Sequence, residues 1–236
     1  VHLKGKLNGW AAPKDVILKL LGILTTKGGT NKIVEYFGEG TESISCTGKA
    51  TITNMGAELG ATTSVFPFDE RMARYLEATE RAEVAQMARD HASYLRADDA
   101  VLADPSKYYD EVIELDLSAL EPHVVGPHTP DKARPISALA AEVKSAGFPD
   151  DVRAALIGSC TNSSYEDIER AAHVARQALA HGMKSKSYLL ISPGSEQIYQ
   201  TIQRDGQMET LNQLGATVLS NACGPCIGNW DRSDIK

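Results

Sequence analysis

The second half of the chain alternates between short apolar runs and longer amphipathic segments. The apolar runs predict strands at 154–157, 187–191 and 216–219. The amphipathic segments predict helices at 165–181, 195–204 and 208–214. A β-α-β-α-β order of this kind implies a parallel sheet with right-handed crossovers.

The first half is less regular. Pro13 opens an apolar stripe that predicts a helix over 14–26, ended by Gly28-Gly29. Further helices are predicted from about Thr53 and over 69–79 and 81–95, and short strands are predicted at 33–37, 65–66 and 109–117. Four prolines and a glycine between 121 and 135 exclude a regular helix or central strand there.

These elements predict an α/β protein made of two consecutive α/β domains with mostly parallel sheets. We expect the first domain at 1–118, a linker at 119–135, and the second domain at 136–236, incomplete at its C-terminus. The chain begins at Val1 without an initiator Met and stops soon after its last cysteine. Both ends therefore suggest a piece of a longer protein.

Composition narrows the function classes. The net charge of −7 disfavours nucleic-acid binding, and no apolar run approaches the roughly 20 residues needed to cross a bilayer. Four cysteines in a chain of 236 residues do not make a disulfide framework, so we expect a reducing compartment.

Three cysteines carry the strongest chemical signal. Cys160 follows the predicted strand 154–157, and Cys223 and Cys226 form a C-x-x-C motif after the strand 216–219. The carboxyl ends of parallel strands share one edge of a sheet, so these thiols are expected to converge. Three soft thiolates suit zinc or an iron–sulfur cluster, and an odd number leaves one metal position open for chemistry.

Other interpretations of these cysteines remain open on the residues alone. The C-x-x-C pair is compatible with a redox dithiol, half of a zinc site, or two core thiols. A structural zinc would need a fourth ligand from Cys46, His173 or His181. Both histidines lie inside a predicted helix, far from its start near Cys160. Cys46 lies in the other predicted domain, and a cysteine of this kind is more often a small buried hydrophobic residue than a metal ligand.

Longer stretches of the chain resemble the mitochondrial branch of the aconitate hydratase (aconitase) family. The most specific matches are Gly60 to Pro67 and Ala222 to Gly228. Further matches are Gly5 to Leu7, Ile44 to Gly48, Asn54 to Glu58, Leu156 to Asp167, Ser192 to Gln197, and Asn221 to Arg232. The resemblance runs from end to end and covers the family's second domain and most of its third.

The resemblance implies a hydro-lyase that interconverts citrate and isocitrate through cis-aconitate in the tricarboxylic acid cycle, in the mitochondrial matrix. It places a [4Fe–4S] cluster, with its open iron as Lewis acid, on Cys160, Cys223 and Cys226, and it places cluster-proximal catalytic roles on Asn54 and Glu58. It implies tricarboxylate substrates, and neither nucleic acid nor membrane as partners. An Asn and a Glu four residues apart would share one face of an α-helix. The spacing alone favours a solvated polar face, and the resemblance is what favours the catalytic role.

The chain also departs from the family pattern. It lacks the family's Asp-Ser-His run, and its one Asp-His pair, Asp90-His91, falls in a polar helix. The resemblance implies that the domain carrying the family's catalytic Ser lies outside this chain. The family's N- and C-terminal domains are therefore expected partners, and the chain alone is expected to be inactive. The alternative is a non-catalytic fragment, with zinc or without metal, that only binds partners.

Overall fold

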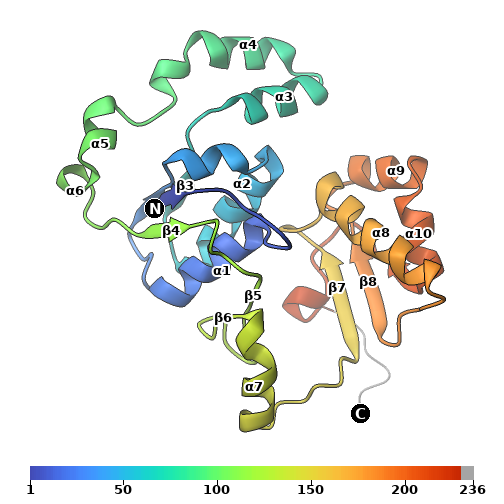
Figure 1. Ribbon diagram of the computed structural model, residues 1–236. Helices are drawn as coiled ribbons and strands as arrows, with labels where there is room; N and C mark the ends of the chain where they lie inside the picture. Colours follow the sequence, from blue (N-terminus) through green and yellow to red (C-terminus); the bar gives the residue numbers. More distant parts are fainter. Residues whose placement is uncertain (230–236) are drawn as a thin grey trace. The chain divides into compact units, whose positions relative to one another are not determined.

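The computed structural model describes residues 1–229 and separates the chain into two units (Figure 1). The first unit is Val1–Gly147, and the second begins at Phe148. Within the described residues the fold is mixed α/β with short, mostly parallel sheets, as predicted. No helix in this part of the chain has the length and apolar character needed to cross a membrane.

The first unit holds three two-stranded sheets. The strands β1 (His2–Lys4) and β4 (Glu114–Asp116) pair in parallel, as do β2 (Ile33–Glu35) and β3 (Thr63–Val65). The strands β5 (His123–Val124) and β6 (Arg134–Pro135) pair antiparallel. The predicted strand at 109–117 shortens to β4 because its partner β1 offers only three residues for pairing.

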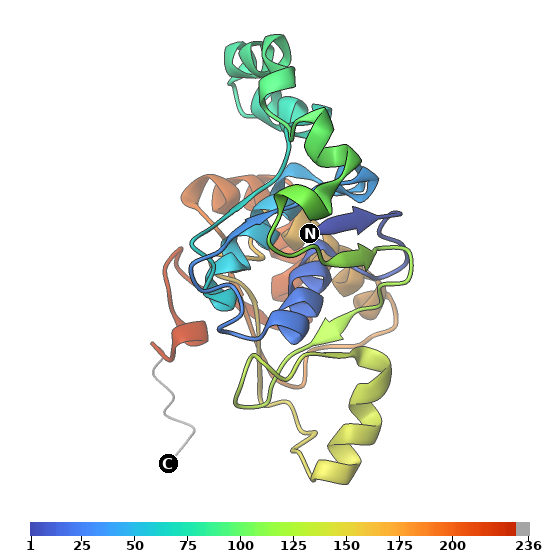
Figure 2. The same ribbon diagram turned by 90° about the vertical axis from the view of Figure 1, so that its left-hand side faces the viewer.

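Helices make up most of the rest of this unit. They are α1 (Pro13–Leu24), α2 (Cys46–Asn54), α3 (Glu70–Ala78), α4 (Ala82–Asp90), α5 (Asp99–Ala103), α6 (Pro105–Tyr108) and α7 (Ile136–Ala146), with 3₁₀ turns η1 (Glu39–Ser43), η2 (Met55–Leu59) and η3 (Ala92–Tyr94). The two views show α3 and α4 side by side at one end of the unit and α7 at the other (Figures 1 and 2).

The helix α1 is the centre of the first core. Pro13 occupies its first position, and the Asp15 carboxylate accepts a hydrogen bond from the Ala12 amide at 2.7 Å, which closes the first turn. Its apolar stripe is buried from Val16 to Leu21 and partly buried at Leu24, which confirms the helix predicted from that pattern. The stripe and its neighbours in the core are Val16, Ile17, Leu20, Leu21, Tyr36, Ile52, Leu59 and Leu117.

The segment predicted as a linker, 119–135, packs on the first unit. The His123 amide donates to Asp15 at 2.7 Å, and the Thr26 amide donates to Asp131 at 2.6 Å. The division of the chain therefore falls after Gly147, and α7 belongs to the first unit rather than to the second. The predicted boundaries at 118 and 136 differ from it because prolines interrupt regular structure without preventing a loop from packing.

The helix expected from about Thr53 begins earlier. Ser45 caps α2, its hydroxyl accepting from the Gly48 amide at 3.0 Å, and the helix ends at Asn54. The 3₁₀ turn η2 then carries Glu58. The shared α-helical face predicted for Asn54 and Glu58 is therefore wrong, because a 3₁₀ helix advances about 120° per residue.

The second unit follows the predicted order closely. It contains β7 (Ala154–Gly158), α8 (Tyr165–Ala180), β8 (Tyr188–Ser192), α9 (Glu196–Arg204), α10 (Gln207–Leu214), β9 (Ala216–Val218) and the 3₁₀ turn η4 (Pro225–Ile227). The three strands form one parallel sheet in the order β7-β8-β9. The helices α8, α9 and α10 pack together beside it around Ile168, Ile191 and Ile202 (Figure 1).

Candidate functional site

Cys160 lies on a tight turn at the carboxyl end of β7. Gly158 and Ser159 both adopt positive φ angles, +116° and +70°. A Cβ on Gly158 would lie 1.9 Å from the carbonyl oxygen of Ser192, so only glycine fits there. The Ser159 amide donates to that same oxygen at 3.0 Å. The turn therefore closes against β8 and leaves Cys160 exposed to solvent.

Cys223 and Cys226 lie on the segment that follows β9, and both thiols are exposed. The Leu219 amide donates to the carbonyl oxygen of Ile191 at 2.7 Å, which keeps the start of this segment beside β8. Cys226 lies in the 3₁₀ turn η4, and the Asn229 amide donates to the Gly224 carbonyl at 3.1 Å across that turn. The motif is therefore folded into a compact loop at the same sheet edge as Cys160.

One contact joins the two cysteine loops. Ser159 Oγ lies 3.2 Å from Cys226 Sγ. A hydrogen bond from the Ser159 hydroxyl lowers the pKa of the Cys226 thiol, against the opposing effect of partial burial, and backbone donors near Gly224 add to the lowering. A lowered thiol pKa favours the thiolate, the form that binds metals.

The structure does not gather a finished metal site within residues 1–229. No group of three His, Cys, Asp or Glu side chains in this part of the chain is arranged to hold a metal ion. The Cys160 side chain has Thr161 Oγ1 as a neighbour at 3.5 Å. Convergence of the three sulfurs on one cluster therefore stays a prediction, while the loops that carry them meet through Ser159 and Cys226.

The three candidates for a fourth zinc ligand, His181, His173 and Cys46, lie in different environments. His181 follows the last residue of α8, which is about 24 Å along the helix axis from the end near Cys160. His173 lies near the middle of the same helix and is exposed. Cys46 is half-buried in the first unit, and burial raises the pKa of its thiol, which disfavours the thiolate.

Asn54 and Glu58 are both exposed in the first unit. Asn54 is the last residue of α2, and Glu58 lies on η2, whose neighbours Met55, Gly56 and Leu59 are buried. Both residues are therefore on the surface of the first unit, and their catalytic role stays a prediction.

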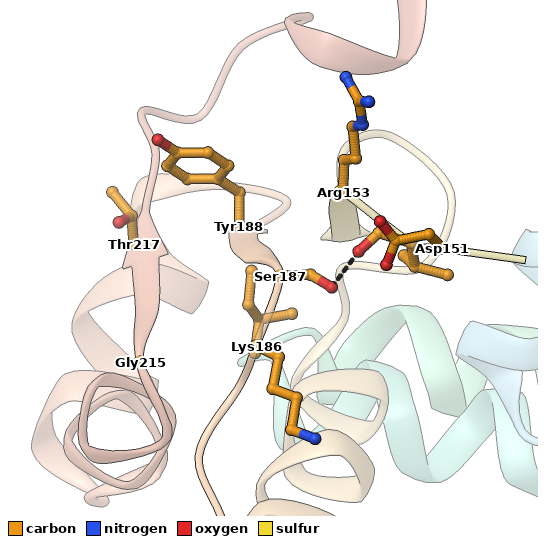
Figure 3. A pocket seen from close by; sticks show the side chains of 9 residues that line it. Asp151, Arg153, Lys186, Ser187, Tyr188, Gly215 and Thr217 are labelled. Carbon is orange, nitrogen blue, oxygen red and sulfur yellow. Dashed lines mark hydrogen bonds between the residues drawn. The ribbon is translucent and has the colours of Figure 1, made fainter. Parts of the chain in front are cut away.

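The amino end of the second unit's sheet carries an open pocket of about 530 Å³. The residues that line it lie close to where the strands begin, and among them are Asp151, Arg153, Lys186, Tyr188 and Thr217 (Figure 3). The Arg153 and Lys186 side chains point away from each other, so they do not converge on one anion. The cysteine loops leave the opposite ends of these strands.

Comparison with known proteins decides the family. Residues 1–236 match the family described as "Aconitase family (aconitate hydratase)". The chain belongs to the aconitase family. Among named relatives, the mitochondrial aconitate hydratases of Emericella nidulans and Saccharomyces cerevisiae are 56% and 57% identical over 236 residues, and that of Gracilaria gracilis is 58% identical over 235.

This aconitase-family chain spans about 30% of the length of those relatives, although each match covers all of the chain. Among solved structures, Thermococcus kodakaraensis aconitase X (holo-form) aligns with 94% of this chain and 43% of its own, at 16% identity and a TM-score of 0.44.

Within the aconitase-family chain, the sequence indicated the cysteines but not the groups that hold their loops. Ser159 and Ser192 lie inside stretches that match the family, yet a serine in a loop carries no signal of its own role. Only the contacts at 3.2 Å to Cys226 and at 3.0 Å to the Ser159 amide identify them.

Proposed function

We propose that Cys160, Cys223 and Cys226 hold a [4Fe–4S] cluster and that this chain forms the cluster-bearing part of a mitochondrial aconitate hydratase. The activity is the interconversion of citrate and isocitrate through cis-aconitate in the mitochondrial matrix. The observation that carries the proposal is the Ser159–Cys226 contact, which joins the two cysteine loops at one sheet edge. The family match supports the reaction.

The donor set fits such a cluster. Cysteine thiolates are its usual protein ligands, and all three thiols are exposed on loops rather than locked into the core. The lowered pKa of Cys226 favours its ligating form. Three protein ligands also leave room for a substrate oxygen.

A [4Fe–4S] cluster with one iron free of protein ligands supplies a Lewis acid. The chain's own contribution is to hold that group and to orient the substrate. The three thiolates bind the cluster, and the Ser159 hydroxyl donates to Cys226 and holds one of them in place. In this proposal the exposed Glu58 carboxylate would accept a hydrogen bond from a hydroxyl or water, and Asn54 keeps the cluster-proximal role that the family resemblance implies.

Anaerobic reconstitution of the chain with ferrous iron and sulfide tests the proposal. We expect a brown protein with about four irons per chain and a broad visible sulfide-to-iron absorption band. A colourless chain that takes up stoichiometric zinc and no iron would instead support the metal-binding scaffold without catalysis.

A further inference from the structure

The two cysteine loops flank a strand that carries no cysteine. The strands β7 and β9 are both neighbours of β8, so they lie about 10 Å apart across it. Within residues 1–229, the loops that follow them form no backbone hydrogen bond with each other. Besides the Ser159–Cys226 contact, the end of β8 is therefore where groups that align Cys160 with Cys223 and Cys226 are expected.

Ser192, the last residue of β8, contacts both loops. Its carbonyl oxygen accepts from the Ser159 amide at 3.0 Å, and its hydroxyl donates to the Ser220 carbonyl at 3.4 Å. The residue pairs with Gly158 in the sheet register, where the glycine allows the close approach. Ser192 is only 2% exposed, so the hydroxyl competes with little water for these partners.

The turn after Ser192 extends the same arrangement. The Gly194 amide donates to the carbonyl of buried Ser163 at 3.1 Å, and a Cβ on Gly194 would lie 2.5 Å from Ser163 Oγ. The loop that carries Cys160 is therefore held at one end by Ser192, the last residue of β8, and at the other by Gly194, which follows that strand. The loop of Cys223 and Cys226 is held at its start through Ser220.

We propose that Ser192 is a positioning residue that sets the spacing between the Cys160 thiol and the thiols of Cys223 and Cys226. The proposal rests on the proposed cluster site for its biological meaning, but the spacing itself can be measured without a cluster. Ser220 is exposed, so its carbonyl can turn to water when the Ser192 hydroxyl is lost. Loss of the Ser192 hydroxyl is then expected to release the start of the loop that carries Cys223 and Cys226, with only a small change in the free energy of unfolding.

The test is a Cd²⁺ titration of the reduced chain, followed through the thiolate-to-cadmium charge-transfer band in the ultraviolet. Wild type is expected to bind one Cd²⁺ through the thiolates of Cys160, Cys223 and Cys226. Ser192→Ala is expected to bind it about tenfold more weakly, as for other groups that orient metal ligands. Ser192→Thr, which keeps the hydroxyl, is expected to bind as wild type does.

Matched variants separate positioning from folding. Ser192→Val has nearly the shape of Ser192→Thr but lacks the hydroxyl, so it is expected to bind like Ser192→Ala. Thr217→Val removes a hydroxyl from the amino end of the same sheet and is expected to leave Cd²⁺ affinity unchanged. Thermal unfolding and near-ultraviolet circular dichroism verify the fold of each variant. If Ser192→Ala fails to fold, the comparison of Cd²⁺ affinity between Ser192→Thr and Ser192→Val tests the role of the hydroxyl.

Equal Cd²⁺ affinity in the Thr and Val variants, or no thiolate–cadmium band in wild type, would overturn the positioning role. Iron and sulfide content after reconstitution, measured on the same wild-type sample, reports separately on the cluster. A wild-type chain that binds Cd²⁺ through its thiols but assembles no cluster would refute the proposed function and leave the role of Ser192 standing.

Discussion

Lys49 Nζ forms an ion pair with the Asp69 carboxylate, linking the middle of α2 to the residue that caps α3. The Lys49 side chain is 3% exposed and that of Asp69 is 18% exposed. The same carboxylate accepts from the Arg71 and Met72 amides at 3.1 and 3.0 Å. The pair thus anchors α2, the helix that ends at Asn54, to the α3–α4 hairpin.

Lys49→Met is expected to lower the free energy of unfolding of the chain by about 3 kcal/mol, because it leaves a carboxylate unpaired in a largely buried position. This loss is at the lower end of the range for breaking a buried ion pair, because the Asp69 carboxylate still accepts from the Arg71 and Met72 amides. Lys32→Met is the matched control. Lys32 pairs with Glu111, and their side chains are 45% and 49% exposed. Removing this exposed pair is expected to lower the free energy of unfolding by less than about 1 kcal/mol. Urea unfolding measures both, and equal losses would contradict the argument from burial.

A second ion-pair group predicts a pH dependence of the α3–α4 hairpin. Arg89 on α4 donates to Glu70 and Glu77 on α3 at 3.0 and 2.6 Å. The hydrogen bond from Arg89 holds the pKa of the Glu70 carboxyl below its usual value. A depressed folded-state pKa adds stability that is present above the unfolded-state pKa and is lost as the pH falls through the folded-state value.

We therefore expect amide exchange in α3 and α4 to accelerate, after correction for intrinsic rates, when the pH falls below the usual range of glutamate. Arg89→Met is expected to show the faster exchange already at neutral pH and to lose the acid response. Arg96→Met, which breaks a neighbouring exposed pair with Asp99, serves as control. An acid response that survives in Arg89→Met would show that another group controls the hairpin.

Cysteine substitutions test the ligand set. Cys160→Ser, Cys223→Ser and Cys226→Ser are each expected to abolish cluster retention, because a hydroxyl is a harder and weaker ligand for iron than a thiolate. Cys46→Ser is expected to retain full iron content. The measurement is iron and sulfide per chain after anaerobic reconstitution, and a comparable loss in Cys46→Ser would show that the ligand set is misassigned.

The chain by itself is expected to show no measurable hydro-lyase activity, even with a full cluster. It spans about 30% of the relatives' length, and its sequence contains no Asp-Ser-His run. Loss of groups that act together typically lowers a rate by several orders of magnitude. The formation of cis-aconitate, followed by ultraviolet absorbance, measures this, and turnover at the rate of a full-length enzyme would mean that the catalytic groups lie within these residues.

The local sequence pattern was sufficient to predict an element or a ligand wherever one signal, such as apolar periodicity or thiol chemistry, was strong. The strands and helices of the second unit followed from alternating apolar runs and amphipathic segments, and their order alone implied the parallel sheet. The helix α1 followed from Pro13 and a single apolar stripe. The cysteines were identified because thiols at strand ends are chemically distinctive, and the family match followed from motifs that any reader of the sequence can compare.

What the sequence by itself determined, then, was the order of elements and the candidate ligands, since periodicity and side-chain chemistry are local properties. Tertiary structure alone decided the contacts between distant segments. It joined Ser159 to Cys226, placed Ser192 between two loops, packed 119–135 on the first unit, and divided Asn54 and Glu58 between α2 and η2. These outcomes depend on which backbone groups find partners far along the chain, and no local pattern encodes that pairing.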